Sequence, residues 1–202
     1  MSRNSPPVCT QCGLGLSGAF DAKLLCTGCR RKPPAFDMAR APWCYRGPVQ
    51  QAIQQFKYNH CWRLTDWLVQ GMARSALTDL PMEQIDFVVP VPMHWLKKRL
   101  KGFDHTVFLA RSVARILNKP FAPQLLQSIR WTKSQTRLGF THRFRNVRGK
   151  FRARSVPHSI PLLVDDVLTS GATAHACAKA LKEAGARQVF VITAARTPLS
   201  LQ

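Results

Sequence analysis

The stretch LLVDDVLTSGAT, residues 162–173, decides the fold class of this chain. Residues 160–165 predict an apolar strand that ends at Asp165, with Asp166 next to it; residues 169–173 predict a turn, and the segment after them has apolar residues at helical spacing. A buried strand followed by a turn and a helix is one unit of an α/β fold. The apolar face of the predicted helix comprises Ala174, Cys177, Ala178 and Leu181, and Gly185 follows as its C-terminal cap.

Similar units flank this stretch. Residues 189–194 (VFVITA) predict another apolar strand directly after the helix, and residues 85–92 (IDFVVPVP) predict a strand that ends at prolines. This alternation predicts a parallel sheet that helices cover on both faces. Two predicted helical faces are Val49, Ala52, Ile53 and Phe56, and Leu64, Trp67, Leu68, Gly71 and Met72; a further predicted helix bears Leu109, Val113, Ile116 and Leu117.

The turn after the acidic pair has the composition of an anion-binding loop. Its backbone N–H groups and hydroxyls can surround a phosphate at a helix N-terminus, where the helix dipole also favours an anion. Asp165 and Asp166 are expected at the carboxyl end of the strand, where they can contact ribose hydroxyls or hydrated magnesium. The segment therefore predicts a site for a phosphorylated ribose, with a simple turn and helix cap as the alternative. The loop residues are Thr169, Ser170, Gly171, Ala172 and Thr173.

Four of the seven cysteines form two pairs near the N-terminus. Cys9 and Cys12 are separated by two residues, as are Cys26 and Cys29. This is the spacing of a tetrahedral four-thiolate site, for which zinc is the expected ion. We expect the zinc to be structural, because so short a segment cannot build a core alone, and a redox or catalytic role is the alternative.

Two prolines, Pro33 and Pro34, separate this cysteine segment from the rest of the chain. We therefore expect a zinc ribbon over residues 1–35 and an α/β domain over residues 36–202, which suits a length of 202 residues. No run of about eighteen apolar residues occurs, and the N-terminus lacks the apolar stretch of a secretory signal. The expected protein is soluble and cytoplasmic, with no membrane span.

The net charge of +20 is high for this length and favours polyanionic partners such as nucleic acid. Basic residues are densest between Lys133 and Arg154. A solvated charged face is the alternative explanation. The candidate nucleic-acid contacts are Lys133, Arg137, Arg143, Arg145 and Arg148.

Together these features resemble the ComF family of competence-associated proteins, within the type I phosphoribosyltransferase superfamily. The resemblance spans nearly the whole chain and also rests on residues 89–92, followed by Arg99, Gly102 and Phe103. A further signature lies within residues 132–151. Its matching positions are Thr132, Lys133, Gln135, Leu138, Arg143, Asn146, Gly149 and Phe151.

The chain departs from the family pattern at two places. Asp104-His105 stands where members commonly carry Asn-Gln, and His142 stands where Glu usually precedes Arg143. The other histidines show no ligand spacing, and the sequence assigns none of the six a role.

The resemblance implies a type I phosphoribosyltransferase-like fold and a role in natural transformation, helping imported single-stranded DNA reach the cytoplasm. In some bacteria a helicase-like, DNA-translocating ATPase is encoded nearby and is a candidate partner. Two further functions stay open: a transferase and a scaffold for that ATPase. The transferase would use phosphoribosyl pyrophosphate and magnesium, with Asp165 and Asp166 catalytic and Arg99 and Lys101 holding pyrophosphate. In a purely binding role, the loop would accept a nucleotide or a terminal phosphate.

Overall fold

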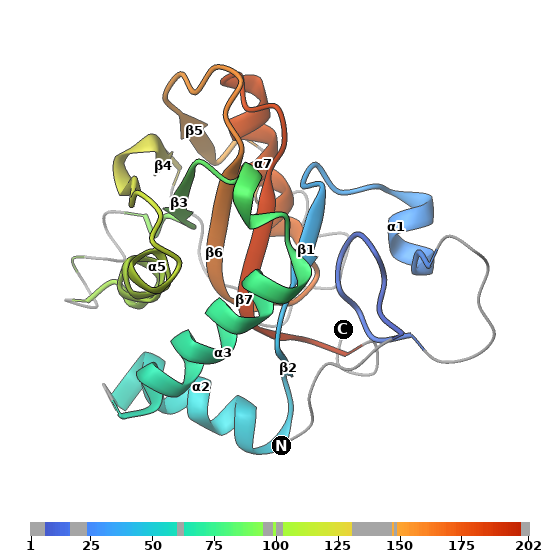
Figure 1. The fold of residues 1–202 in the computed structure, drawn as a ribbon, viewed down its shortest axis with the longest axis vertical. Coiled ribbons are helices and arrows are strands. Elements are labelled where there is room, and N and C mark those ends of the chain that lie inside the picture. Colours follow the sequence, from blue (N-terminus) through green and yellow to red (C-terminus); the bar gives the residue numbers. More distant parts are fainter. Residues whose placement is uncertain are drawn as a thin grey trace.

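A parallel β-sheet forms the middle of the protein (Figure 1). The computed structural model describes residues 7–16, 24–59, 63–94, 99, 103–130, 147 and 149–198. Within them the sheet has the strand order β1-β7-β6-β3, with β2 pairing with the later part of β7, and every pairing is parallel. The strands are β1 (Met38–Arg40), β2 (Trp43–Cys44), β3 (Phe87–Pro90), β6 (Pro161–Leu168) and β7 (Phe190–Arg196).

Three helices cover the first face of the sheet. They are α2 (Gly47–Asn59), α3 (Arg63–Asp79) and α5 (His105–Ile116). Alternate strand residues, including Leu162 and Ile192, point into this layer and share one apolar cluster with it. The predicted face of α2 is confirmed, because its four apolar residues are all buried. The predicted helix bearing Leu109, Val113 and Ile116 is α5, and its last residue, Ile116, is 37% exposed.

The second face is covered by α7 (Ala172–Glu183), by an antiparallel pair of short strands and by the cysteine segment. Leu163 and Val191 point toward this layer. The predicted apolar face of α7 is confirmed, since all four residues are buried. Gly185 follows the helix with a φ of +107°. The remaining elements are α1 (Thr27–Arg31), β4 (Leu126–Ser128), β5 (Phe151–Ala153) and two short 3₁₀ turns, Met82–Gln84 and Pro123–Leu125.

Strand β6 is longer than the sequence predicts. The predicted strand ends at Asp165, but the structure continues it to Leu168, because Val167 and Leu168 pair with residues of β7. On its other edge β6 pairs with β3 only as far as Val164. Among the described residues, the end of β6 therefore has a strand neighbour on one side alone, and α2 and α5 place Lys57 and His105 beside it.

The cysteine segment docks on the edge strand β1. The Ala39 N–H donates to the Gln11 carbonyl over 2.7 Å, and the Gln11 side-chain amide donates to the Phe36 carbonyl over 3.4 Å. Gly13 is required at the contact, because a Cβ there would lie 2.7 Å from the Ala39 oxygen. The predicted boundary at residue 35 falls between α1 and β1.

The α/β class predicted from the sequence is confirmed by this parallel sheet and by the small four-cysteine cluster beside it. None of the helices in the described part of the chain is long and apolar enough to cross a membrane.

Candidate functional site

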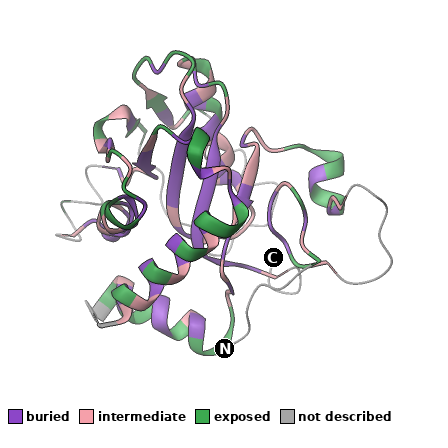
Figure 2. Cartoon of the chain, viewed as in Figure 1, coloured by how far each residue is buried: buried purple, intermediate pink, exposed green. Residues whose placement is uncertain are grey.

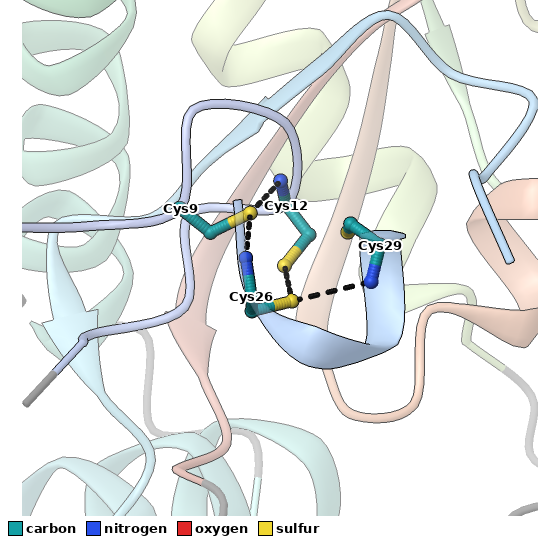
Figure 3. A group of neighbouring side chains, drawn as sticks. All are labelled: Cys9, Cys12, Cys26 and Cys29. Atoms are coloured by element: carbon teal, nitrogen blue, oxygen red, sulfur yellow. Dashed lines mark hydrogen bonds between the residues drawn. The ribbon is translucent and has the colours of Figure 1, made fainter. Parts of the chain in front are cut away.

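Four cysteines converge beside the amino-terminal end of α1 (Figure 3). Their Sγ atoms all lie within 4.8 Å of one another, and those of Cys12 and Cys26 are 3.6 Å apart. Backbone N–H groups point at two of the sulfurs: Cys12 and Cys26 donate to Cys9 Sγ, and Cys29 donates to Cys26 Sγ. These four residues, called the cysteine centre below, are all buried.

The geometry of the cysteine centre fits a metal ion. A tetrahedral zinc with Zn–S distances of about 2.3 Å requires sulfur atoms about 3.8 Å apart, close to the separations observed here. Hydrogen bonds among the four sulfurs lower the pKa of Cys9 and Cys26 and raise that of Cys12 and Cys29, so two of the four thiols ionise readily, and the thiolate is the form that binds metal. The four predicted ligands can therefore hold a metal such as zinc.

The predicted phosphate loop forms a tight turn between β6 and α7. Gly171 has a φ of +77°, a left-handed conformation that favours glycine, and it precedes the first helical residue, Ala172. The Ser170 hydroxyl accepts a weak hydrogen bond from the Ala172 N–H over 3.4 Å. Thr169, Ser170, Gly171 and Thr173 are partly exposed, so the start of α7 is accessible.

Asp166 lies in a buried charge cluster on the first face of the sheet. Its Oδ2 is 2.7 Å from Lys57 Nζ of α2 and 2.9 Å from His105 Nε2 of α5. Burial alone would raise the pKa of Asp166, but the Lys57 ammonium, followed by the His105 hydrogen bond, holds it below its ordinary value. The pKa of Lys57 is raised: burial opposes its charge, and Asp166 more than compensates.

Asp165 lies on the other side of β6, with Leu163. It is partly exposed, pairs in register with the buried Thr193 of β7, and accepts a hydrogen bond from the Asp166 N–H over 2.9 Å. Loss of hydration, followed by the charge of Asp166, raises the pKa of Asp165 to about 8. The two neighbouring carboxylates therefore have opposite pKa shifts, and at neutral pH Asp165 is mostly protonated.

Lys57 and His105 are functional candidates that sequence reasoning missed. The signal for His105 was its place in Asp104-His105, where the family commonly carries Asn-Gln. The Asp104 side chain caps α5 by accepting from the Val107 N–H over 3.2 Å, which sets His105 at the first turn of the helix. Nothing in the sequence marked Lys57 as a candidate, because its contact with Asp166 depends on where packing places α2 relative to β6.

The other predicted site residues are not brought together in the described structure. Arg99 is exposed. The second pyrophosphate candidate, Lys101, lies outside the described residues, as do the nucleic-acid candidates Lys133, Arg137, Arg143, Arg145 and Arg148.

Comparison with known proteins finds relatives that match almost the whole chain. Competence protein F of Haemophilus influenzae is 26% identical over 94% of this chain and 85% of its own length. The DNA utilization protein YhgH of Salmonella typhi is 28% identical over 96% and 86%, and that of Escherichia coli K12 is 27% identical over 97% and 87%. No family model matches. These relatives confirm the resemblance that the sequence motifs indicate.

Proposed function

Since this chain belongs to the ComF family, we propose that it serves natural competence by assisting the uptake or processing of single-stranded DNA. In this proposal the loop Thr169–Thr173 binds phosphoribosyl pyrophosphate or the phosphate of a nucleotide. Zinc fills the cysteine centre and has a structural role.

The observation that carries the ligand proposal is the turn between β6 and α7. The left-handed Gly171 has no side chain to cap α7, the Ala172 N–H makes only a weak hydrogen bond with the Ser170 hydroxyl, and the N–H groups at the start of the helix can donate to an anion. Asp165 is partly exposed near the preceding strand end, where ligands of parallel sheets bind. A mostly protonated Asp165 also repels a phosphate less than an ionised one does.

Ligand binding without turnover is favoured over transferase activity. In a transferase, Asp165 and Asp166 would steady the ribose while magnesium neutralises the pyrophosphate, with Arg99 and Lys101 contacting it. Asp166 is instead held by Lys57 and His105. That contact occupies one of the two carboxylates that a transferase would need free for ribose or magnesium. The transferase, which would use phosphoribosyl pyrophosphate and an acceptor, is the second candidate function.

The DNA part of the proposal rests on charge. The net charge of +20 favours the phosphate backbone of nucleic acid, and Lys133, Arg137, Arg143, Arg145 and Arg148 are the proposed contacts. Binding of this kind depends steeply on salt and little on base sequence. A DNA-translocating ATPase is the proposed protein partner, and co-purification from competent cells tests it.

Calorimetry tests the ligand site. Phosphoribosyl pyrophosphate with magnesium, and separately a nucleoside monophosphate, are titrated into wild type, Thr169→Val and a control, Thr78→Val, in which the changed threonine is exposed on α3. We expect wild type and the control to bind and Thr169→Val to bind more weakly. Folded wild type that binds neither ligand would overturn the assignment of the loop. Release of pyrophosphate during the titration would favour the transferase.

Anisotropy titrations test the DNA part separately. Labelled single-stranded oligonucleotides of unrelated sequence are titrated at rising salt concentration. We expect similar affinities for all sequences and a steep fall with salt. An affinity that does not change with salt would exclude binding through the phosphates.

A further inference from the structure

Arg196, the last residue of β7, connects the cysteine centre with the start of the phosphate loop. Its side chain is buried, with 5% of its surface exposed. On one side Nε donates to the Cys12 carbonyl over 3.2 Å, and Nη2 lies 3.8 Å from Cys12 Sγ. On the other side Nη1 donates to the Leu168 carbonyl over 2.8 Å and also to the Thr169 carbonyl.

A buried guanidinium needs a counter-charge, because it stays protonated in proteins. In the part of the chain that the structure describes, no carboxylate forms a salt bridge with Arg196. The group of potential negative charge beside it is the cysteine centre. Four thiolates around a divalent ion carry a net charge of about −2, so the metal-loaded centre supplies the missing charge.

The contacts on the loop side fix the backbone that leads into the turn. Leu168 is the last residue of β6, and Thr169 is the first of the loop. The Leu168 carbonyl also accepts from the Thr197 N–H over 3.0 Å, so a backbone hydrogen bond from the residue after Arg196 fixes the same carbonyl. Both carbonyls accept from Nη1, so a shift of the guanidinium moves two consecutive peptide groups just before Gly171.

We propose that Arg196 is a positioning residue through which metal in the cysteine centre fixes the conformation of the phosphate loop. The thiolates of the loaded centre hold the guanidinium, and the guanidinium holds the carbonyls of Leu168 and Thr169. The link between metal and loop stands independently of any ligand. Its consequence for phosphate affinity rests on the proposed function of the loop.

The link has a reciprocal consequence. If metal favours the binding-competent loop, a ligand that binds this loop must favour the metal-loaded centre by the same factor. A phosphoribosyl ligand is therefore expected to slow the release of zinc. Such an effect crosses from one site to the other without direct contact between ligand and metal.

The test compares Arg196→Gln with Arg40→Gln in the full zinc-loaded chain. Arg40 is a matched control, because it is a half-buried arginine that also contacts the cysteine segment, donating to the Thr10 carbonyl over 3.0 Å from β1. Two quantities are measured without ligand: the rate of zinc release to a chromogenic chelator, and hydrogen exchange at the amides of residues 169–173. Arg196→Gln is expected to raise the rate of zinc release by about 10- to 100-fold, the usual loss of metal affinity when a residue that supports a metal ligand is removed, and to speed loop exchange as well. Arg40→Gln is expected to leave loop exchange as in wild type.

Three results would overturn the proposal: no change in either quantity, faster zinc release with an unchanged loop, or equal loop exchange in the two variants. If Arg196→Gln does not fold, Arg196→Lys replaces it. Lysine keeps the charge, but its single nitrogen cannot reach the cysteine centre and both carbonyls at once, so loop exchange is still expected to rise. Failure of wild type to bind phosphoribosyl pyrophosphate would contradict the proposed function and leave both measurements interpretable.

Discussion

The two faces of the central sheet are covered by different means. Within the described residues, the first face is covered by the helices α2, α3 and α5, whose buried residues (Figure 2) share one apolar cluster with the strands. The second face is covered by α7, a pair of short strands and the cysteine centre, which joins the same apolar cluster. The first cover is a conventional apolar core, whereas part of the second is a four-cysteine centre that we propose to be stabilised by a bound ion.

The neighbouring carboxylates of β6 show what this difference means for function. Asp166 faces the helices and finds Lys57 and His105 there, so its pKa falls. On the second face Asp165 loses hydration near α7, and its pKa rises to about 8. Adjacent residues of one strand thus acquire different chemistry, because a strand sends successive side chains to opposite faces. We therefore propose Asp166 as a support for the end of β6 and Asp165 as the carboxyl closer to the proposed ligand.

Removal of metal is expected to have the largest effect and to act first on the second face. Structural zinc sites contribute binding free energies of about 10–16 kcal/mol in isolated modules. We expect one zinc per chain and a large drop in melting temperature after treatment with a chelator. Cys12→Ser is expected to abolish zinc retention, whereas the control Cys44→Ser, outside the cysteine centre, keeps it. Equal zinc content in the two variants would contradict the assignment.

Loss of the cation on the first face is expected to have the next largest effect. Lys57→Met leaves Asp166 buried beside His105 alone, and breaking a buried pair of this kind costs about 3–5 kcal/mol in unfolding free energy. Urea unfolding measures this loss of unfolding free energy, with Lys179→Met as the control. Lys179 pairs with Glu183 at an exposed position over 3.6 Å, so its loss is expected to cost about 0–1 kcal/mol.

The pH dependence of this pair has a definite sign. The pKa of Asp166 is lower in the folded protein, so the contribution of the pair is present above the ordinary carboxyl pKa of about 4 and is lost as pH falls through the lower folded value. The stability difference between wild type and Lys57→Met should therefore shrink in acid. Costs of the same size for Lys57→Met and Lys179→Met would show that the buried pair is not stabilising.

Asp165→Asn is expected to show the opposite pH dependence. The folded pKa of Asp165, about 8, lies above the ordinary value of about 4, so between these values the folded state binds more protons than the unfolded state. The unfolding free energy of wild type therefore falls as pH rises through this window. Asparagine cannot ionise, so the unfolding free energy of the variant should not fall in this way. The difference in unfolding free energy between variant and wild type should therefore be larger above pH 8 than near pH 5, by at least about 1.4 kcal/mol, the equivalent of one pKa unit.

Urea unfolding from about pH 5 to about pH 9 measures this difference. The control is Asp66→Asn, which changes an exposed aspartate in the first turn of α3 and should follow wild type. Parallel curves for Asp165→Asn and wild type would contradict the raised pKa. A parallel change in phosphate affinity with pH, absent from Asp165→Asn, would place the ligand beside this carboxyl.

The smallest expected effect on stability separates loop strain from ligand binding. Gly171→Ala and Gly47→Ala both place a Cβ at a positive φ, +77° and +54°, and neither Cβ meets an atom closer than 3.8 Å. We expect each to lower the unfolding free energy by about 1 kcal/mol through backbone strain. Only Gly171→Ala is expected to weaken phosphoribosyl pyrophosphate binding in calorimetry. Equal affinities in the two variants would remove the loop from the site.

Periodicity and spacing predicted much of the fold. The strand, turn and helix around residues 162–185 are strongly periodic, and the parallel pairing of β6 with β7 follows from their alternation with α7. The end of β6 and the exposure of Ile116 escaped prediction. Both depend on partners distant in sequence: paired residues of β7 extend the strand, and neighbouring elements leave the end of α5 uncovered.

The sequence by itself determined the α/β class, the four cysteines that can hold a metal and the glycine at the loop, because each depends on local spacing or backbone conformation. Only the tertiary structure decided the surroundings of the two carboxylates and the contacts of Arg196. Lys57, His105 and Asp166 come from three elements, and Arg196 meets Cys12 across 184 positions of chain. The pKa of a group and the counter-charge of a buried cation depend on what surrounds them in space, and those surroundings exist only after the elements have packed.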